Sequence, residues 1–252
     1  MPFLGLGLHI LIAIYFATHA VRTGQDRYWL WILFAFPGLG SIVYGLTIWL
    51  PQARHSREGH AVVRGVRRII DPDRELRLAQ DDFDATPTTD RRLRLGDALL
   101  AKGRATEAAT HFESALSGVH KHDPDIQVRL ARAWLAAGRA RDARGLLDEV
   151  IQRNPSFRSQ DGHLTYARAV VAEGDRERAR EEFNALTAYS GNLDIHAEYA
   201  ETLRSWGEHD RAAAVCEKAL AGVRRMPAYN RRLYKDAISR MKRMIAELSR
   251  VA

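Results

Sequence analysis

The chain has 252 residues, of which 46% are hydrophobic and 27% are charged. This composition is typical of a folded protein and excludes a wholly disordered chain, and a single cysteine, Cys216, excludes an intrachain disulfide framework. The formal net charge of +7 is unevenly distributed, because residues 223–252 hold nine Lys and Arg but only two Asp and Glu. We therefore expect any acidic partner to bind near that end.

The first fifty residues are almost free of charge. The uncharged runs 3–21 and 28–50 are each long enough, at about 1.5 Å per residue, to cross a hydrocarbon core of about 30 Å. Only the polar residues 22–27 separate them, which predicts a transmembrane helical hairpin over residues 1–52. A cleaved signal peptide is the alternative for the first run, but no basic residue precedes its apolar core.

The second apolar run contains a proline at its middle, Pro37, and small residues on one side. This pattern indicates a kink and a packing face for another helix, with a transport or lipid site as the alternative. The run resembles the amino-terminal membrane segment of phospholipase D-like proteins such as cardiolipin synthases, through Trp31, Phe36, Pro37, Gly40 and Tyr44. That family's catalytic pattern, a histidine and a lysine two residues apart followed by an aspartate, is absent from the sequence, so the resemblance implies no such activity.

Flanking charge predicts the orientation of the hairpin. Two arginines lie in the turn between the runs, whereas five follow the second run, at Arg54, Arg57, Arg64, Arg67 and Arg68. The positive-inside rule then places both chain ends in the cytoplasm. We therefore expect an integral protein of a bacterial inner membrane whose remaining residues lie on the cytoplasmic side.

Residues 53–88 join the hairpin to the rest of the chain. Apolar residues at helical spacing within 55–70, with arginines between them, predict an amphipathic juxtamembrane helix and a linker. Asp71 and Pro72 end that helix and restart another, and residues 85–90 predict a break before the next helix. The juxtamembrane helix can lie on an anionic leaflet or dock on the neighbouring domain, and the pattern does not separate the two.

A repeat covers residues 89–222. Its register is set by glycines 35, 36 and 33 residues apart, at Gly103, Gly138, Gly174 and Gly207. An alanine stands five residues after each glycine, and four residues further on stands a larger residue, at Phe112, Leu147, Phe183 and Cys216. Such a register predicts pairs of antiparallel helices that join at the glycine and stack into a superhelix.

The register resembles the tetratricopeptide repeat (TPR), although the early tryptophan of that pattern is missing here and Cys216 replaces an aromatic residue in the fourth copy. The resemblance implies an all-α solenoid of four TPR-like helix pairs and a non-catalytic adaptor that binds another protein in a concave groove. The groove positions implied are Leu93, Asp97, Val128, Arg129, Arg132, Leu164, Arg168, Glu201 and Arg204. Arg132 and Arg168 either pair with a partner's carboxylates or are merely solvated. The asparagines of the family's carboxylate-clamping pattern are absent, so chaperone-tail binding is not expected.

Residues 223–252 predict a basic C-terminal cap, of one or two helices, that covers the last repeat. One face of this cap is apolar, and the other carries Arg231, Arg232, Lys235, Lys242 and Arg243. The basic face is either a solvated surface or a contact for anionic lipid or, less favoured, for nucleic acid.

Familiar catalytic and phosphate-binding motifs are absent from the sequence. His120, His122 and Asp123 form a small cluster, but three such residues in a loop are usually polar surface, so no metal or other cofactor is expected. The sequence therefore favours a membrane-anchored TPR scaffold without enzymatic activity. The alternative is a membrane-surface module that binds anionic lipid or nucleic acid through its basic C-terminal helix.

Overall fold

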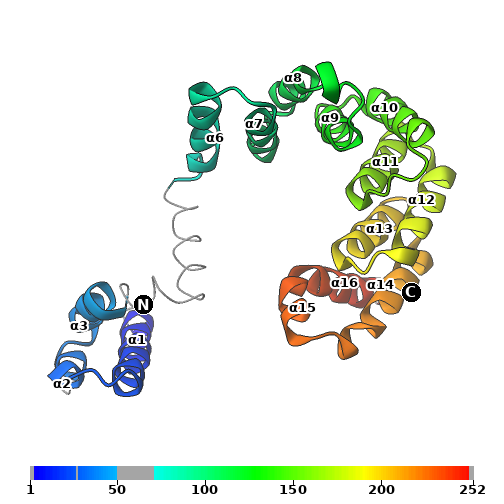
Figure 1. Cartoon of the computed structure of the whole chain (residues 1–252). Helices are drawn as coiled ribbons and strands as arrows, with labels where there is room; N and C mark the ends of the chain where they lie inside the picture. The colour runs from blue at the N-terminus through cyan, green and yellow to red at the C-terminus, as the bar shows by residue number, and fades with distance from the viewer. Residues whose placement is uncertain (1–2, 27, 50–70, 250–252) are drawn as a thin grey trace. The chain divides into compact units, whose positions relative to one another are not determined.

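The computed structural model describes residues 3–26, 28–49 and 71–249. Every regular element within these ranges is a helix, in agreement with the predicted all-α class (Figure 1). The chain divides into two compact units, Met1–Glu75 and Leu76–Ala252. The amphipathic helix predicted over residues 55–70 lies outside the described residues.

The N-terminal unit contains the helices α1 (Phe3–Arg22), α2 (Tyr28–Ala35), α3 (Pro37–Tyr44) and the short π-helix η1 (Gly45–Trp49). The second apolar run is interrupted at Phe36, because Pro37 begins a new helix there and cannot continue the previous one. The side chains of Ala20, Trp29, Leu33 and Tyr44 form a small core between the helices.

This arrangement corrects the membrane prediction. Among the residues that the structure describes, no helix has both the length and the apolar character that a bilayer crossing requires. The run predicted as the second span is divided at Phe36 into α2, of eight residues, and a second stretch in which the eight residues of α3 run into the five of η1. At about 1.5 Å per residue the two stretches are about 12 Å and at most about 20 Å long, short of a hydrocarbon core of about 30 Å. The transmembrane hairpin is not found, and the predicted location in a bacterial inner membrane is wrong.

The boundary between the units falls within the first turn of α6 (Arg74–Ala85), a helix that starts close to Asp71 and Pro72, where the sequence predicts that a helix restarts. Leu76, Ala79 and Phe83 on α6 pack against the core of the first helix pair. Arg92 lies over the Phe83 ring, with 4.8 Å from the guanidinium carbon to the ring centroid. The helix α6 therefore covers the open side of the first helix pair.

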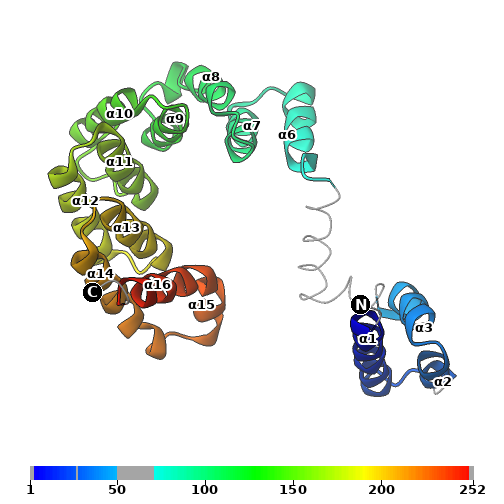
Figure 2. The ribbon, with the colours of Figure 1, turned by 180° about the vertical axis from the view of Figure 1, so that it is seen from behind.

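Four antiparallel helix pairs follow. They are α7 (Thr89–Ala101) with α8 (Ala105–Ala115), α9 (Pro124–Ala136) with α10 (Ala140–Arg153), α11 (Gln160–Glu173) with α12 (Arg176–Tyr189), and α13 (Leu193–Ser205) with α14 (His209–Ala221). Within this unit the first helix of each pair lies on the inner side of the stack (Figures 1 and 2). The predicted pairing of helices is confirmed.

Small residues stand where the paired helices cross. A Cβ atom added to Gly96 would lie 2.6 Å from the Phe112 ring, so an alanine there would force the ring to move. The equivalent positions in the later pairs are fully buried alanines, Ala131, Ala167 and Ala200. The small and large residues of the sequence register are thus packing positions, as predicted.

The C-terminal cap has two α-helices, of the one or two that the sequence left open. After the 3₁₀ turn η3 (Val223–Arg225), α15 (Ala228–Leu233) leads into α16 (Lys235–Leu248). The apolar face of α16 packs on α13 and α14 through Ala237, Met241 and Met244. The other face of α16 is exposed, as the basic pattern of the sequence predicts.

Candidate functional site

The groove positions lie on the first helices of the four pairs, which form the concave side of the repeat unit (Figure 1). Leu93, Asp97, Arg132 and Arg168 are all partly exposed there. Val128 differs, because only 4% of its surface is exposed and it packs against Ala131 and Leu147 inside its own pair. The structure therefore brings most of the predicted groove residues to one surface but places Val128 in the core.

Asp97 on α7 is the centre of a charge cluster on this side. Its carboxylate accepts hydrogen bonds from Arg129 and from Arg132, the latter at 2.8 Å. Arg132 also donates to Asp161 at the start of α11, at 3.0 Å. Three successive first helices are thus joined by ion pairs, and both predicted arginines of α9 already have carboxylate partners.

The same arrangement continues toward the C-terminus. Arg168 on α11 forms a bidentate pair with Glu198 on α13, at 2.5 and 2.6 Å, and this hydrogen bond raises the pKa of the guanidinium. Arg240 on α16 pairs with Glu201 at 3.2 Å and with Asp194 at 2.9 Å.

The last such contact joins Arg204 to Glu247 at 2.9 Å. We call these contacts the concave ion-pair ladder; its members are Asp97, Arg129, Arg132, Asp161, Arg168, Asp194, Glu198, Glu201, Arg204, Arg240 and Glu247. The sequence pattern identified most of its cations but missed most of its acids.

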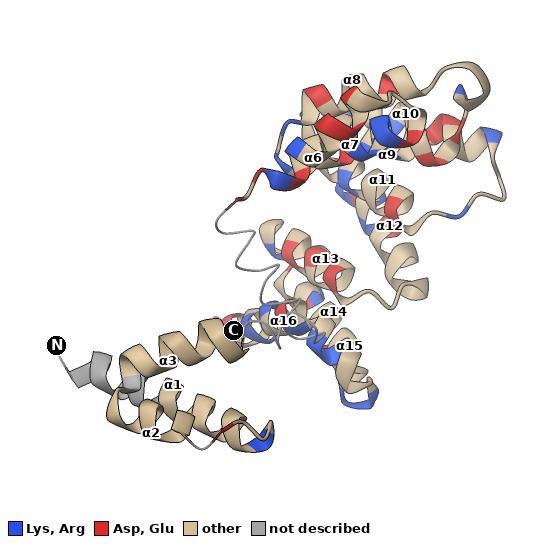
Figure 3. Cartoon of the chain, turned by 60° about the vertical axis from the view of Figure 1, so that its left-hand side comes forward, with Lys and Arg blue, Asp and Glu red and all other residues tan. Residues whose placement is uncertain are grey.

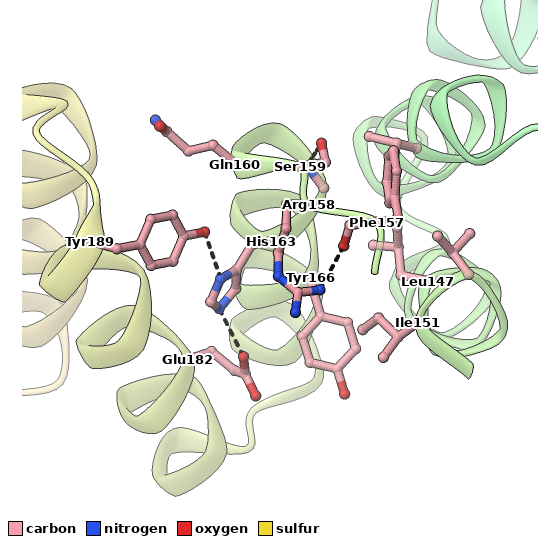
Figure 4. A pocket seen from close by; sticks show the side chains of 13 residues that line it. Leu147, Ile151, Phe157, Arg158, Ser159, Gln160, His163, Tyr166, Glu182 and Tyr189 are labelled. Atoms are coloured by element: carbon pink, nitrogen blue, oxygen red, sulfur yellow. Dashed lines mark hydrogen bonds and ion pairs between the residues drawn. The ribbon is translucent and has the colours of Figure 1, made fainter. Parts of the chain in front are cut away.

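A half-open cavity of about 570 Å³ lies under the loop that joins α10 to α11 (Figure 4). Its apolar walls come from four elements, through Val128, Leu147, Val150, Ile151, Phe157 and Tyr166. Its polar lining consists of Arg158, Ser159, Gln160, His163, Glu182 and Tyr189, together with the backbone of Gly162.

His163 connects the polar groups on one wall of this cavity. Its Nδ1 lies 2.9 Å from the Tyr189 hydroxyl and its Nε2 lies 2.9 Å from the Glu182 carboxylate. The hydrogen bond from His163, assisted by the charge of Arg178, lowers the pKa of Glu182. An ionised Glu182 can accept a hydrogen bond from Nε2–H of His163, and the Tyr189 hydroxyl is the partner of Nδ1, so each of the three polar groups has a partner within the protein.

The sequence did contain a signal for this cavity. His163 stands four residues before Ala167, the register position at which the repeat pattern places its early tryptophan. An imidazole fills less space than an indole, so His163 leaves more open space at this position than a tryptophan would. The sequence showed the missing tryptophan but not its consequence.

The predicted basic surface is formed by the exposed residues Arg231, Arg232, Lys235, Lys242 and Arg243 (Figure 3). Within the described ranges none of these five residues takes part in an ion pair, and neither does Arg224 on η3. A shallow pocket of about 430 Å³ is lined by four cations, Arg224, Arg231, Lys235 and Lys242.

The histidines after the first pair do not converge with their neighbours on one point. His120 lies 3.6 Å from Asp123, whereas His122 contacts Arg153 at 2.8 Å. Among the residues that the structure describes, no group of three or more His, Cys, Asp or Glu side chains is arranged to hold a metal ion.

Comparisons with known proteins identify the type of repeat. A sequence model of the tetratricopeptide repeat matches residues 99–160 and 135–196. A thermophilic TPR protein of Thermus thermophilus superimposes on 65% of this chain and 88% of its own, with a TM-score of 0.52 and 20% identity. The structure of MamA MSR-1 C2 covers 64% of this chain and 98% of its own, with a TM-score of 0.44 and 18% identity.

One relative among curated proteins is DnaJ homolog subfamily C member 3 of Gallus gallus, 26% identical over 140 residues. The match covers 50% of this chain, and the chain spans about a quarter of that protein's length, 27%. Residues 99–196 of this chain therefore match the tetratricopeptide repeat in sequence, and the helix pairs of the second unit have a similar fold to that of the Thermus protein. The resemblance of residues 31–44 to phospholipase D-like proteins finds no support in these comparisons.

Proposed function

We propose that the chain is a non-catalytic scaffold whose repeats bind a segment of a partner protein on their concave side. The observation that carries the proposal is the continuous inner surface formed by α7, α9, α11 and α13. In this proposal, residues 89–222 are four binding repeats and residues 223–252 close the end of the groove. TPR-type repeats present such surfaces to peptides and helices.

The concave ion-pair ladder suggests how a partner would be held. It contains five arginines and six acids, so its formal charges nearly cancel. A partner carboxylate must therefore displace an acid of the ladder from its arginine rather than meet a free cation. Partly exposed Leu93 and Leu164 lie among these charges and supply apolar contact area. We expect binding that weakens little with salt, because apolar contact contributes much of it.

The test replaces Arg132 and Arg168 together with alanine. Half-exposed ion pairs of this kind each stabilise a protein by about 0.2–1 kcal/mol, so the variant should keep its helical circular dichroism. Capture of a crosslinked partner by the purified chain should fall sharply.

The matched control replaces Arg139 and Arg211 with alanine, which removes the same total charge. These two arginines form ion pairs with Asp142 and Glu208 at the second helices of their pairs. If both double variants captured the same amount of partner, the result would contradict the proposal that the partner binds on the concave side. If only the control variant lost its partner, the partner would bind on the side formed by the second helices.

A second candidate function is binding of a phosphate-bearing polyanion by the basic C-terminal surface. It is favoured by the pocket lined by four cations that have no ion-pair partner among the described residues. Replacement of Lys235 and Lys242 with glutamine should weaken binding of a single-stranded RNA oligonucleotide or of phosphatidylglycerol vesicles, tested separately at several salt concentrations. The control replaces Arg232 and Arg243, which carry the same charge but lie outside the pocket. Equal losses in both variants would exclude the pocket as the site.

A further inference from the structure

The cavity under the α10–α11 loop combines an apolar interior with access to solvent. Ile151 and Tyr189 line it, yet 58% and 60% of their surfaces are exposed. Leu147 and Val150 behind them are buried. Large apolar side chains that remain exposed around a concave surface are typical of a place that another molecule covers. The volume of about 570 Å³ lies within the range of about 300–1,000 Å³ found for small-ligand sites.

Arg158 supplies a positive charge at this cavity. Its guanidinium donates to the backbone oxygens of Pro155 and Phe157, at 2.7 and 3.1 Å, and in Figure 4 it points into the cavity between His163 and Tyr166. No carboxylate of the described residues pairs with it, in contrast to the arginines of the concave ion-pair ladder. The cation is thus fixed by its own loop but is not neutralised.

The opposite wall adds no free negative charge. Glu182 is held by Arg178 at 2.7 Å and by His163 at 2.9 Å, so its carboxylate is satisfied within the protein. The Tyr189 hydroxyl lies 2.9 Å from Nδ1 of His163, and its oxygen has two lone pairs with which it can accept a hydrogen bond. An occupant of the cavity would therefore meet apolar walls, one unneutralised cation and a phenolic oxygen.

We propose that this cavity binds a small amphipathic carboxylate, with its apolar body between Leu147, Ile151 and Tyr166 and its carboxylate paired with Arg158. The lining determines this choice of ligand. Burial of an apolar body against the apolar walls favours binding, because it removes apolar surface from water. A carboxylate forms a charge-assisted hydrogen bond with Arg158 that is stronger than the one a neutral group would form. The cavity shares only Val128 with the predicted groove positions. Ligand binding here is consequently independent of the partner binding proposed for the concave side.

The test uses 2-naphthoate, which joins a two-ring apolar body to one carboxylate, and 2-naphthamide as its neutral isostere. Titration of the full chain is followed by calorimetry and by the amide resonances of Gly162 and His163 in the cavity wall. We expect naphthoate to shift these resonances and to bind about tenfold more tightly than naphthamide, since a hydrogen bond between two charged groups is stronger than one to a neutral amide.

Variants locate the binding contacts. R158Q should lower naphthoate affinity about tenfold and leave naphthamide affinity unchanged. R153Q is the matched control, because it removes the same charge from a residue five positions away that does not line the cavity. I151W should weaken both probes by filling the cavity from an exposed position, with little effect on folding.

Three results would overturn the proposal. They are equal affinity for the two probes, an equal effect of R158Q and R153Q, and resonance shifts that map away from the cavity or fail to appear at millimolar probe. Each variant should give the same circular dichroism spectrum as the parent chain. Lost binding then results from the change in the cavity and not from unfolding.

Discussion

Two glycine-to-alanine substitutions test the assignment of the repeat glycines as inter-helix turns. Gly174 joins α11 to α12 with a backbone φ of +85°, and a Cβ atom there would meet nothing within 4 Å. Gly145 lies in the interior of α10, is exposed, and would also give its Cβ open space. The same methyl group is therefore added at two sites without steric conflict, and only the backbone conformation differs.

The expected changes in the free energy of unfolding have opposite signs. Left-handed backbone costs a non-glycine residue roughly 1–2 kcal/mol. Alanine also restricts the unfolded chain more than glycine does, which offsets about 0.4–1 kcal/mol of this strain. Together the two effects predict that G174A lowers the free energy of unfolding by about 1 kcal/mol. G145A carries no such strain and should stabilise its exposed helix by about 0.5–1 kcal/mol.

Urea unfolding followed by far-UV circular dichroism gives both values. The midpoints should move in opposite directions from that of the parent chain, and melting temperatures should differ by about 2–4 °C for each kcal/mol in a unit of this size. If both variants shift in the same direction, or if G174A is neutral, the glycine register does not depend on left-handed turns and the argument fails.

Two further substitutions and one labelling experiment probe the core and the cavity wall. F183A removes a fully buried ring that stacks on Tyr199 with 5.0 Å between centroids, and should lower the free energy of unfolding by about 3–5 kcal/mol in urea titrations. Burial raises the pKa of the Cys216 thiol to about 11, so a thiol reagent at mildly alkaline pH should label it only after denaturant unfolds the chain. The lowered pKa of Glu182 stabilises the fold above the ordinary carboxyl value of 4.5, and this contribution is lost as pH falls through the folded-state value. E182Q should therefore show a shallower loss of stability with acid than the parent chain, measured as urea midpoints, whereas equal slopes would contradict the coupling to His163.

The repeat fold could be predicted from the sequence because its packing is periodic. A glycine, an alanine and a larger residue recur at fixed offsets, and each has a local physical reason that the sequence shows directly. The contact between Gly96 and Phe112 is an example, since only a residue without a side chain fits where the ring crosses. Such rules need no knowledge of distant residues.

The N-terminal unit shows where that reasoning stops. Apolar content alone predicted two membrane spans, and the proline at position 37 was interpreted as a kink within one span. In the structure Pro37 instead begins a separate helix, and Trp29, Leu33 and Tyr44 pack together with Ala20 of α1. This core is small, because large apolar side chains such as Trp31 and Phe34 remain 75% and 83% exposed. An uncharged run therefore does not by itself fix where its helices begin and end.

The sequence also did not show which arginine pairs with which acid. The structure shows that four of these ion pairs share nearly the same spacing along the chain. Arg132, Arg144, Arg168 and Arg180 each pair with an acid 28 to 30 residues later, because that offset brings a residue of the next helix pair alongside. The residues at the same offsets from Arg158 are Leu186, Thr187 and Ala188, none of which can accept its charge. Arg158, which lies in the loop before α11 and borders the apolar cavity, therefore has no carboxylate at the offset that pairs those four arginines, and none of the described residues forms an ion pair with it.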